Sequence, residues 1–572
     1  MGVMAMAMAM GHSGSRQSLR TYADSEGFSN PRRAVRLLGA LLVLIAPSVL
    51  AQYGSTAPGT FGGGSRPGDL APPRTDPNKP ETPGRGKRSW EIVPTLSVEE
   101  TYTDNVRLRP SGSERSDWVT RLRPGVSVNG NGARLRFNAT YTADVVDRAQ
   151  EGTNDIFHYL NATGDAELVR QLVFVDARAS VSQQNVSLLG PQAESNVSNT
   201  ENRTTVRTFL VSPYLRHNFG HDAQGEVRLT YSTVNTGRTS AGAAASLSDS
   251  DSTRIGMRLA SGPAFKLLTW NIDYSKEHIA YDSGQDIDIE KVSAGARRLI
   301  TPTLGLKVNV GYEDNNYITT GPAVDGAFWS VGPEWTPTPR TRLAATVGRR
   351  FDKPNYLLDF GHRTRLTTWS VKYSEDVTTQ RQQFVVPASV DTATILDTLF
   401  LAGIPDPLVR QQAVQAFIAQ TGLPPSLSVP VNFFTTTPFL LKRWQASFGI
   451  QGVRNTILAN VFKETREATA AGQAGAGDFA ASNSTTQTGT SLIWTLRMTA
   501  QTTSNVSVAY TRNEFPSLTR EDDLTFIRLN LTRQFQPRVS GSLNFRRLKN
   551  DSNQGGAGYT ENAVSAVLGM RF

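Results

Sequence analysis

Histidine is the side chain of this sequence best suited to acid–base or metal chemistry near neutral pH, and its distribution favours neither. None of the candidates lies in a Gly-x-Ser-x-Gly or comparable nucleophile motif; they are His158, His217, His221, His278 and His362. His217 and His221 are four residues apart, but Asn218 and Gly220 between them predict a turn, not a helix that would align two metal ligands. The chain contains no cysteine, which excludes a thiolate nucleophile and a cysteine metal site. We therefore predict no catalytic residue, no metal, no cofactor and no enzyme activity.

Charged residues at alternate positions of strand-like segments are the more informative set. We predict that these side chains face a water-filled interior: Arg134, Arg136, Arg178, Arg228, Lys307, Arg342, Lys372, Asp144, Asp176, Glu226, Asp273 and Glu313. Mixed charges in such a position normally pair and shape a pore. The alternative is a slightly cationic conduit for an anionic sugar polymer. The formal charge of +9 is spread along the chain, without the basic face and stacking aromatics that nucleic-acid binding needs.

The elements that position these charges are β-strands, because apolar and polar residues alternate with a period of two. From residue 135 to residue 145 the odd positions hold Leu, Phe, Ala, Tyr, Ala and Val, and the even positions hold Arg, Asn, Thr, Thr and Asp. The apolar face is rich in small and medium residues, and the polar face carries charges. That pattern predicts apolar side chains facing outward and polar ones facing inward, the reverse of a soluble sandwich. No apolar run approaches the roughly 20 residues that a membrane-spanning helix needs.

The connections alternate between short turns and longer loops, as the hairpins of an outer-membrane barrel do. Short turns are predicted at 129–132, 170–171, 262–263, 301–303, 336–339, 452–454 and 536–538, and longer loops at 185–203, 237–249 and 470–483. The predicted fold is all-β: a transmembrane antiparallel up-and-down β-barrel of about 22 strands with both ends in the periplasm. A hairpin repeat in a soluble β-protein is the alternative.

A repeated tyrosine motif and the last strand support this topology. Tyrosine followed by Ser, Thr or an acid recurs near strand ends, and the members are predicted to form an external aromatic girdle: Tyr102, Tyr141, Tyr231, Tyr274, Tyr312, Tyr373 and Tyr510. The alternation of Leu568, Met570 and Phe572 at the end of the chain resembles the C-terminal signal that barrel-assembly machinery recognises.

The N-terminal residues are predicted to form an export signal followed by a flexible tether. Residues 1–51 have the basic, apolar and small-residue pattern of a signal peptide, with predicted cleavage after Ala51. Residues 52–88 are dominated by Gly, Pro, Ser and charge and predict a disordered periplasmic linker. The linker is too short for the plug domain of TonB-dependent transporters. The barrel is predicted to occupy residues 89–572.

One segment, 385–432, interrupts the strand pattern on the external side. Asp406 and Pro407 predict the start of a helix with Leu408, Val414, Phe417 and Ile418 on one apolar face. A second short amphipathic piece precedes it. The apolar face must pack on something: the insertion either narrows the pore as a gate or forms a capping subdomain that covers its own apolar face.

Several short sequence segments of this region resemble those of a known family. They are YSEDVTT at 373–379, IPDP at 404–407, RQQAVQAFIAQTGLPP at 410–425 and VNFF at 431–434. They are similar to outer-membrane proteins associated with the PEP-CTERM system, which are found with exopolysaccharide and biofilm loci in Gram-negative bacteria. The resemblance implies an envelope context linked to exopolysaccharide, and it transfers no activity and no site residues.

Three functions follow as hypotheses for an outer-membrane barrel. The first is a passive channel or export conduit, and the second is a non-conducting barrel that organises extracellular matrix. The third is an outer-membrane hydrolase, which would need clustered His, Ser and carboxylate groups. The expected partners are outer-membrane lipid and lipopolysaccharide, the barrel-assembly machinery and an anionic exopolysaccharide, with no nucleic acid.

Overall fold

The computed structural model describes residues 90–237, 248–317, 325–385, 438–469 and 477–572, together with single positions between 396 and 435. All of them belong to one compact unit, 51–572. The predicted signal peptide (1–51) and linker (52–88) lie outside the described residues, and so does Leu408. Among the described residues no helix has the length and apolar character to cross a membrane.

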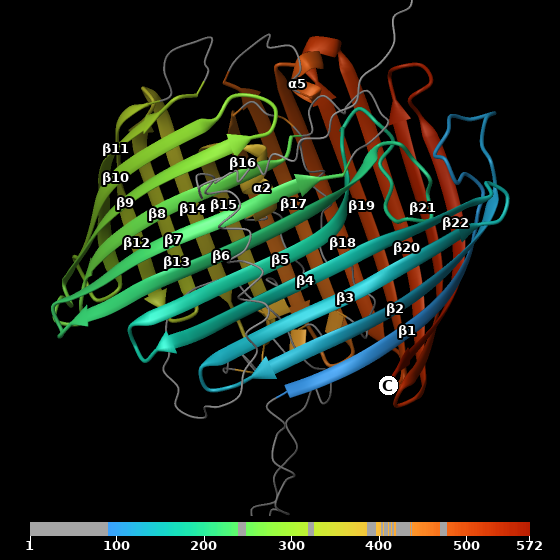
Figure 1. The fold of residues 1–572 in the computed structure, drawn as a ribbon, viewed down its shortest axis with the longest axis horizontal. Coiled ribbons are helices and arrows are strands. Elements are labelled where there is room, and N and C mark those ends of the chain that lie inside the picture. Colours follow the sequence, from blue (N-terminus) through green and yellow to red (C-terminus); the bar gives the residue numbers. More distant parts are fainter. Residues whose placement is uncertain are drawn as a thin grey trace, which may run out of the picture. The chain divides into compact units, whose positions relative to one another are not determined.

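Strands form most of the described chain (Figure 1). Their bounds are β1 Trp90–Thr103, β2 Asp117–Asn131, β3 Leu135–Arg148, β4 Thr153–Val169, β5 Val173–Asn185, β6 Arg203–Phe219, β7 Ala223–Thr236, β8 Ser250–Ser261, β9 Leu268–Tyr281, β10 Ile287–Leu299, β11 Leu304–Asn315, β12 Gly326–Thr338, β13 Thr341–Arg350, β14 Lys353–Arg363, β15 Thr367–Thr378, β16 Phe439–Gln451, β17 Asn455–Ala468, β18 Ser484–Arg497, β19 Thr502–Phe515, β20 Arg520–Gln536, β21 Val539–Ser552 and β22 Tyr559–Arg571. The short helices with printed bounds are α2 Gln380–Val385, α5 Asp478–Ala481 and the 3-10 turn Pro516–Leu518.

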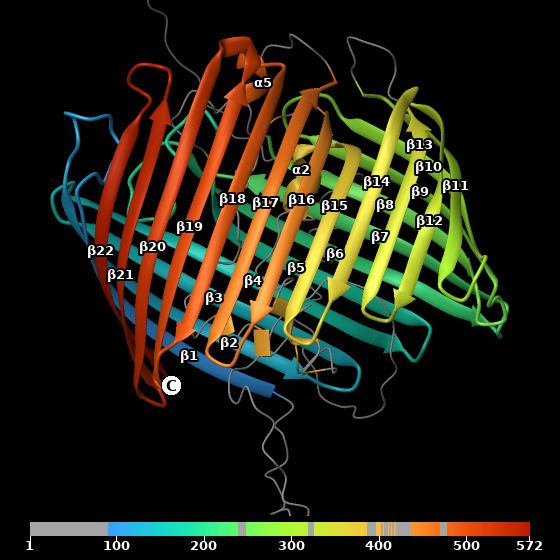
Figure 2. The same cartoon turned by 180° about the vertical axis from the view of Figure 1, so that it is seen from behind.

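The strands form one closed antiparallel barrel of 22 strands, which confirms the predicted fold. Each strand pairs with the next along the chain, and β1 pairs with β22, from Thr95 opposite Arg571 to Thr103 opposite Ala563. The backbone N–H of Phe572 donates to the carbonyl of Pro94 at 3.0 Å beside this seam. The opposite walls of the barrel are seen in Figures 1 and 2.

Most hairpins alternate as predicted, but the two-residue turn between β13 and β14 lies at the end that carries the long loops. Turns such as 132–134, 170–172 and 452–454 lie at one end, where β1 begins and β22 finishes, and loops such as 186–202 lie at the other. The prediction for His217 was wrong in detail. His217 belongs to β6, which runs on to Phe219, and only His221 lies in the turn. The chain stays extended through His217 because the left-handed turn residue is Gly220, whose φ is 61°.

The register decides which side chains face outward, because directly opposed residues share a face of the sheet. On β1 the outward Trp90, Ile92 and Tyr102 are exposed, whereas the inward Glu99 and Thr101 are buried. The same division holds around the barrel, and the exposed large side chains are mostly Leu, Val, Ile, Trp and Tyr. A closed barrel with an apolar exterior and a polar interior is an integral outer-membrane protein, since only lipid satisfies such a surface.

Candidate functional site

The candidate site is the lumen of the barrel. Of the charged residues predicted to face it, the cross-strand register places these on the inward face: Arg136, Arg178, Arg228, Lys307, Arg342, Lys372, Asp144, Asp176, Glu226, Asp273 and Glu313. Arg134 lies in the turn before β3. Many of these groups pair, as in the contact of Arg228 with Asp176 at 2.8 Å.

Residues 186–202, which we call the inner loop, join β5 to β6 and contact the inner wall of the barrel. The Asn196 amide donates to Asp144 Oδ2 and to the Tyr159 hydroxyl, both at 2.7 Å. Arg148 Nη2 donates to the carbonyl of Asn196 at 2.6 Å. These partners belong to the inward faces of β3 and β4, so this loop occupies part of the lumen instead of extending away from the barrel.

A charged contact and an apolar contact hold the inner loop to more distant strands. Glu194 pairs with Arg528 of β20, and its second oxygen lies 3.6 Å from Arg546 of β21. Val197 is fully buried among valines of the first strands, including Val119 and Val146. The loop therefore links β2 and β3 with β20 and β21 across the seam of the barrel.

The other end of the inner loop binds α5. The Leu188 N–H donates to Asp478 Oδ2 at 2.7 Å, and the Ser187 hydroxyl donates to the other oxygen. The Leu188 side chain packs with Phe439, Phe479 and Phe515 in a buried cluster. Two segments that are far apart in the chain thus cover the external end of β16 and β19.

The two buried carboxylates of this loop system are held in different charge environments. Burial acts to raise the pKa of Glu194, but attraction to Arg528 and Arg546 outweighs it and leaves the pKa below its ordinary value. Burial raises the pKa of Asp478, and the hydrogen bonds from Ser187 and Leu188 oppose this shift only in part. Glu194 is therefore a charged anchor of the inner loop.

The insertion begins with α2, which docks on the inner wall. Arg381 is 3% exposed, and its guanidinium donates to the carbonyl and hydroxyl oxygens of both Ser232 and Ser250. Phe384 packs beside the buried Val206 and Val234. These partners belong to β6, β7 and β8, so α2 lies against that wall inside the barrel.

Described positions further along the insertion are helical and reach the opposite wall. Leu396, Leu399, Phe400, Val414 and Phe417 form a buried cluster with Leu458 of β17 and Ile493 of β18, and Ile418 packs against it. Leu458 and Ile493 are opposed in the register and face inward. The proposed gate residues Val414, Phe417 and Ile418 thus pack on the barrel wall within the lumen, in place of a separate external cap.

The inner wall from β8 to β15 has a different character, because in most of its ion pairs the cation is more exposed than the acid; the pair of Arg350 with the exposed Asp376 is the exception. The exposed fractions of three cations are 52% for Arg254, 60% for Arg258 and 62% for Arg342. Those of their acidic partners are lower: 15% for Glu277, 35% for Asp273 and 18% for Glu334. Lys307 and Lys372 are exposed on the same face. Water along this wall meets a predominantly positive surface.

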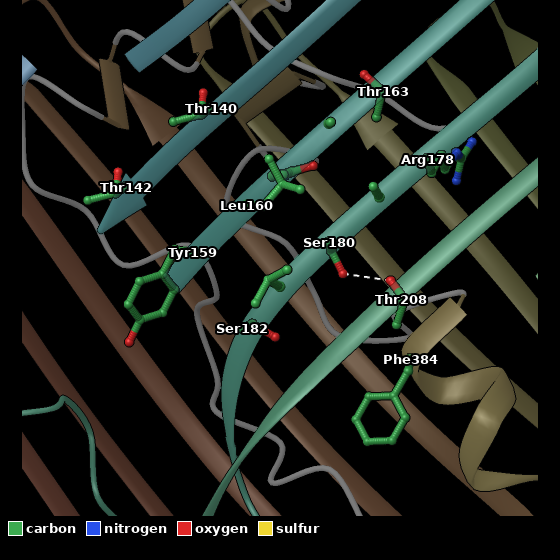
Figure 3. Close-up of a pocket in the computed structure, with 14 residues that line it drawn as sticks. Thr140, Thr142, Tyr159, Leu160, Thr163, Arg178, Ser180, Ser182, Thr208 and Phe384 are labelled. Carbon is green, nitrogen blue, oxygen red and sulfur yellow. Dashed lines mark hydrogen bonds between the residues drawn. The ribbon is translucent and has the colours of Figure 1, made fainter. Parts of the chain in front are cut away.

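A cavity of about 480 Å³ lies against β3 to β6 (Figure 3). Its inward-facing lining is hydroxyl-rich, and Phe384 of α2 also lines it. The polar residues that line it are Thr140, Thr142, Tyr159, Asn161, Thr163, Arg178, Ser180, Ser182 and Thr208.

The predicted girdle and assembly residues lie on the outward face. Tyr102, Tyr141, Tyr231, Tyr274, Tyr312, Tyr373 and Tyr510 all belong to strands that run toward the long loops, and their ring positions face outward. The Tyr510 hydroxyl donates to Asp523 at 2.6 Å and the Tyr274 hydroxyl to Glu290 at 3.0 Å. Leu568 and Met570 face outward near the seam, and Phe572 follows β22. Their roles in membrane anchoring and assembly stay predictions.

The histidines lie apart from one another on the outer surface or in turns. His158 contacts Tyr141 at 2.8 Å, His278 contacts Asp288 at 2.8 Å and His362 contacts Thr341 at 2.9 Å. Within the described ranges, no group of three or more His, Cys, Asp or Glu side chains could hold a metal ion.

Sequence reasoning missed the docking residues of the inner loop and of α2, namely Glu194, Asn196 and Arg381. A usable signal was present in the strands. Val146, Leu458 and Ile493 are apolar residues at inward positions, where the period-two pattern predicts polar ones. An apolar residue on a wet face needs cover, so such exceptions mark where internal segments pack.

No known family and no curated protein matches this chain. Among solved structures, it is similar to the siderophore receptor PirA from Acinetobacter baumannii, with 10% identity, TM-score 0.43, and coverage of 84% of this chain and 80% of that one. The FrpB iron transporter from Neisseria meningitidis gives 10% identity, TM-score 0.34 and coverage of 84% and 83%. OccK2 (OpdF) from Pseudomonas aeruginosa gives 7% identity and TM-score 0.33, with coverage of 84% of this chain and 98% of that one. Likenesses of this size carry no conclusion about function.

Proposed function

We propose that this outer-membrane barrel is a passive channel that prefers anions, with its water path along the inner wall from β8 to β15. The observation that carries the proposal is the arrangement of charge on that wall: Arg254, Arg258 and Arg342 project toward water, and the carboxylates beside them lie deeper. A pore lined in this way attracts anions and repels cations at short range.

Two internal segments support a narrow path instead of a wide one. About 22 strands enclose an interior much wider than a selective pore. The inner loop lies against β2, β3, β20 and β21, and the described part of the insertion lies against β6 to β8 and β17 to β18. On the wall from β8 to β15, Arg254, Arg258 and Arg342 are exposed, and we place the path of the solute there.

The finer proposal is that the conduit serves an exopolysaccharide system. Its support is the resemblance of residues 373–379, 404–407, 410–425 and 431–434 to PEP-CTERM-associated outer-membrane proteins, together with the cationic wall, which suits an anionic sugar polymer. The channel and the polymer are separate claims, since an anion-preferring pore can serve small solutes alone.

The reversal potential of the purified protein in planar bilayers under a KCl gradient tests the channel directly. We expect it to have the sign of chloride preference, and the triple variant Arg254→Gln, Arg258→Gln, Arg342→Gln to move it toward zero. Arg136→Gln, which removes an inward arginine from β3, is the matched control. Cation preference of the native protein, or a reversal potential that the triple variant leaves in place, would refute the proposed anion path.

A non-conducting barrel that organises matrix is the second candidate, and the docking of the inner loop favours it. Ion pairs, amide hydrogen bonds and four apolar clusters hold this loop inside the barrel, as they would in a permanent plug. The absence of conductance both in the native protein and after removal of the inner loop would favour the structural role.

A further inference from the structure

We infer that the cavity between β3–β6 and α2 is a binding site for a hydroxylated ring that carries one anionic group, such as an acidic sugar unit. The inference rests on the proposed conduit, and it adds a substrate class and a binding site on the lumen wall beside the proposed path. The chemistry is read from the cavity lining in Figure 3.

The register arranges the lining in rows across four strands. Thr140, Asn161, Ser180 and Thr208 form one row of directly opposed residues, and Thr142 with Tyr159 and Thr163 with Arg178 belong to the neighbouring rows. Opposed side chains on one face lie roughly 5 Å apart, so the wall offers a lattice of hydroxyl and amide groups. Such groups both donate and accept, which matches the dual character of sugar hydroxyls.

One cation lies at the end of this lattice nearer the short turns. Of the two carboxylates closest to Arg178 in the register, Asp176 pairs with Arg228 at 2.8 Å. Asp165 lies 4.0 Å from Arg136 and attracts Arg178 only from beyond ion-pair distance. Among the described residues no carboxylate reaches ion-pair distance of Arg178. Its planar guanidinium is suited to bidentate recognition of a carboxylate or phosphate.

Phe384 supplies an apolar surface at the edge of the hydroxyl wall, beside Thr208. Figure 3 shows the Phe384 ring, which belongs to α2, near Thr208 and Ser182. Arg178 lies further along β5. An apolar ring beside hydrogen-bonding groups suits a sugar ring, whose C–H groups and hydroxyls point in different directions. The volume of about 480 Å³ falls in the ordinary range of small-molecule pockets, which is roughly 300–1,000 Å³.

Calorimetric titration of the purified full-length protein, with block of its bilayer current as a second readout, tests the site. The probes are galacturonate, glucose 6-phosphate, neutral galactose and acetate. We expect one or both of the acidic sugars to bind with a Kd of about 1 mM, and galactose and acetate to bind at least tenfold more weakly. The preference between galacturonate and glucose 6-phosphate identifies the anionic group.

Substitutions then separate recognition of the anionic group from recognition of the sugar hydroxyls. Arg178→Gln is expected to weaken the acidic sugars about tenfold and to leave galactose unchanged, because one charge-assisted contact is lost. Thr163→Val, which keeps the side-chain shape, should weaken acidic and neutral sugars alike. Lys372→Gln on β15 removes one inward positive charge far from the cavity and should change neither.

Outcomes for the site and for the channel are distinguishable. Anion-preferring conductance without acidic-sugar binding, or binding that Arg178→Gln leaves intact, overturns the site and keeps the channel. Acidic-sugar binding in a protein that does not conduct keeps the site and overturns the channel.

Discussion

At the scale of single residues, Arg381 shows how a short segment is held inside a wide barrel. Helix α2 has six residues, too few to be stable alone. The Arg381 guanidinium binds four neutral oxygens of Ser232 and Ser250, which lie on adjacent strands. One side chain thus joins α2 to both β7 and β8.

We predict that Arg381→Ala releases α2 from the wall. The lost hydrogen bonds come from a charged donor, so docking should weaken by roughly 3 kcal/mol. The expected result is a noisier single-channel current with larger open levels. Arg381→Lys keeps the charge without the planar fork and should give an intermediate effect. Identical current records for the native and Arg381→Ala proteins would contradict the docking role.

Glu194 makes the position of the inner loop sensitive to acid. The pKa of Glu194 in the docked loop lies below its ordinary value of 4.5. The ion pairs of Glu194 therefore stabilise docking fully above pH 4.5. This stabilisation is lost as the pH falls through the lowered pKa and the carboxylate is protonated. We predict steady conductance from pH 7 to about pH 5 and fluctuating, larger currents in strong acid.

The variant Glu194→Gln should show these fluctuations already at neutral pH, because the amide cannot hold Arg528 and Arg546 by charge. Single-channel recordings at a series of pH values check both statements. Conductance of the native protein that rises with increasing pH would show that a different group controls the loop.

At the scale of elements, the inner loop and the insertion are the parts that leave the regular pattern. Each packs on apolar residues that interrupt the polar inward faces: Val146 for the inner loop, and Leu458 and Ile493 for the insertion. The strands supply a uniform frame, and these two segments decide how much of the lumen is filled.

We predict that replacing residues 187–201 by a short Gly-Ser turn raises the conductance several-fold, because it exposes the inner faces of β3 and β20 to water. Bilayer conductance in symmetric salt measures the change. Replacing residues 554–556 in the exposed β21–β22 loop is the control, since that loop stays at the barrel rim. Equal conductance of all three proteins would mean that the path does not depend on the inner loop.

At the scale of the whole molecule, stability depends on which face of the sheet meets lipid. Val310 and Asn309 are neighbours near the middle of β11, the first outward and 49% exposed, the second inward. We predict that Val310→Arg destabilises the barrel by about 2–4 kcal/mol, the cost of a charge near the bilayer centre. Asn309→Arg should be tolerated, because its side chain meets the water of the lumen.

Reversible unfolding in denaturant with lipid vesicles measures both variants. The pair is matched in position and in introduced charge, so only the direction of the side chain differs. Comparable loss of stability in the two variants would contradict the assignment of lipid and lumen faces.

The sequence by itself determined the strand number, the alternation of turns and loops, and the inward or outward direction of most side chains. All of these follow from period-two patterning and turn chemistry, which are local properties of the chain. The inward placement of Arg136, Lys307 and Lys372 could therefore be predicted without any contact being known.

Only the tertiary structure decided how the lumen is filled. Glu194 meets Arg528 and Arg546, which are 334 and 352 residues away in sequence, and Arg381 meets Ser232 and Ser250, 149 and 131 residues away. Closure of the barrel brings such positions together, and no local pattern encodes which loop then turns inward. The cavity beside Phe384 exists for the same reason: its walls are strands, and part of its lining is a segment folded back on them.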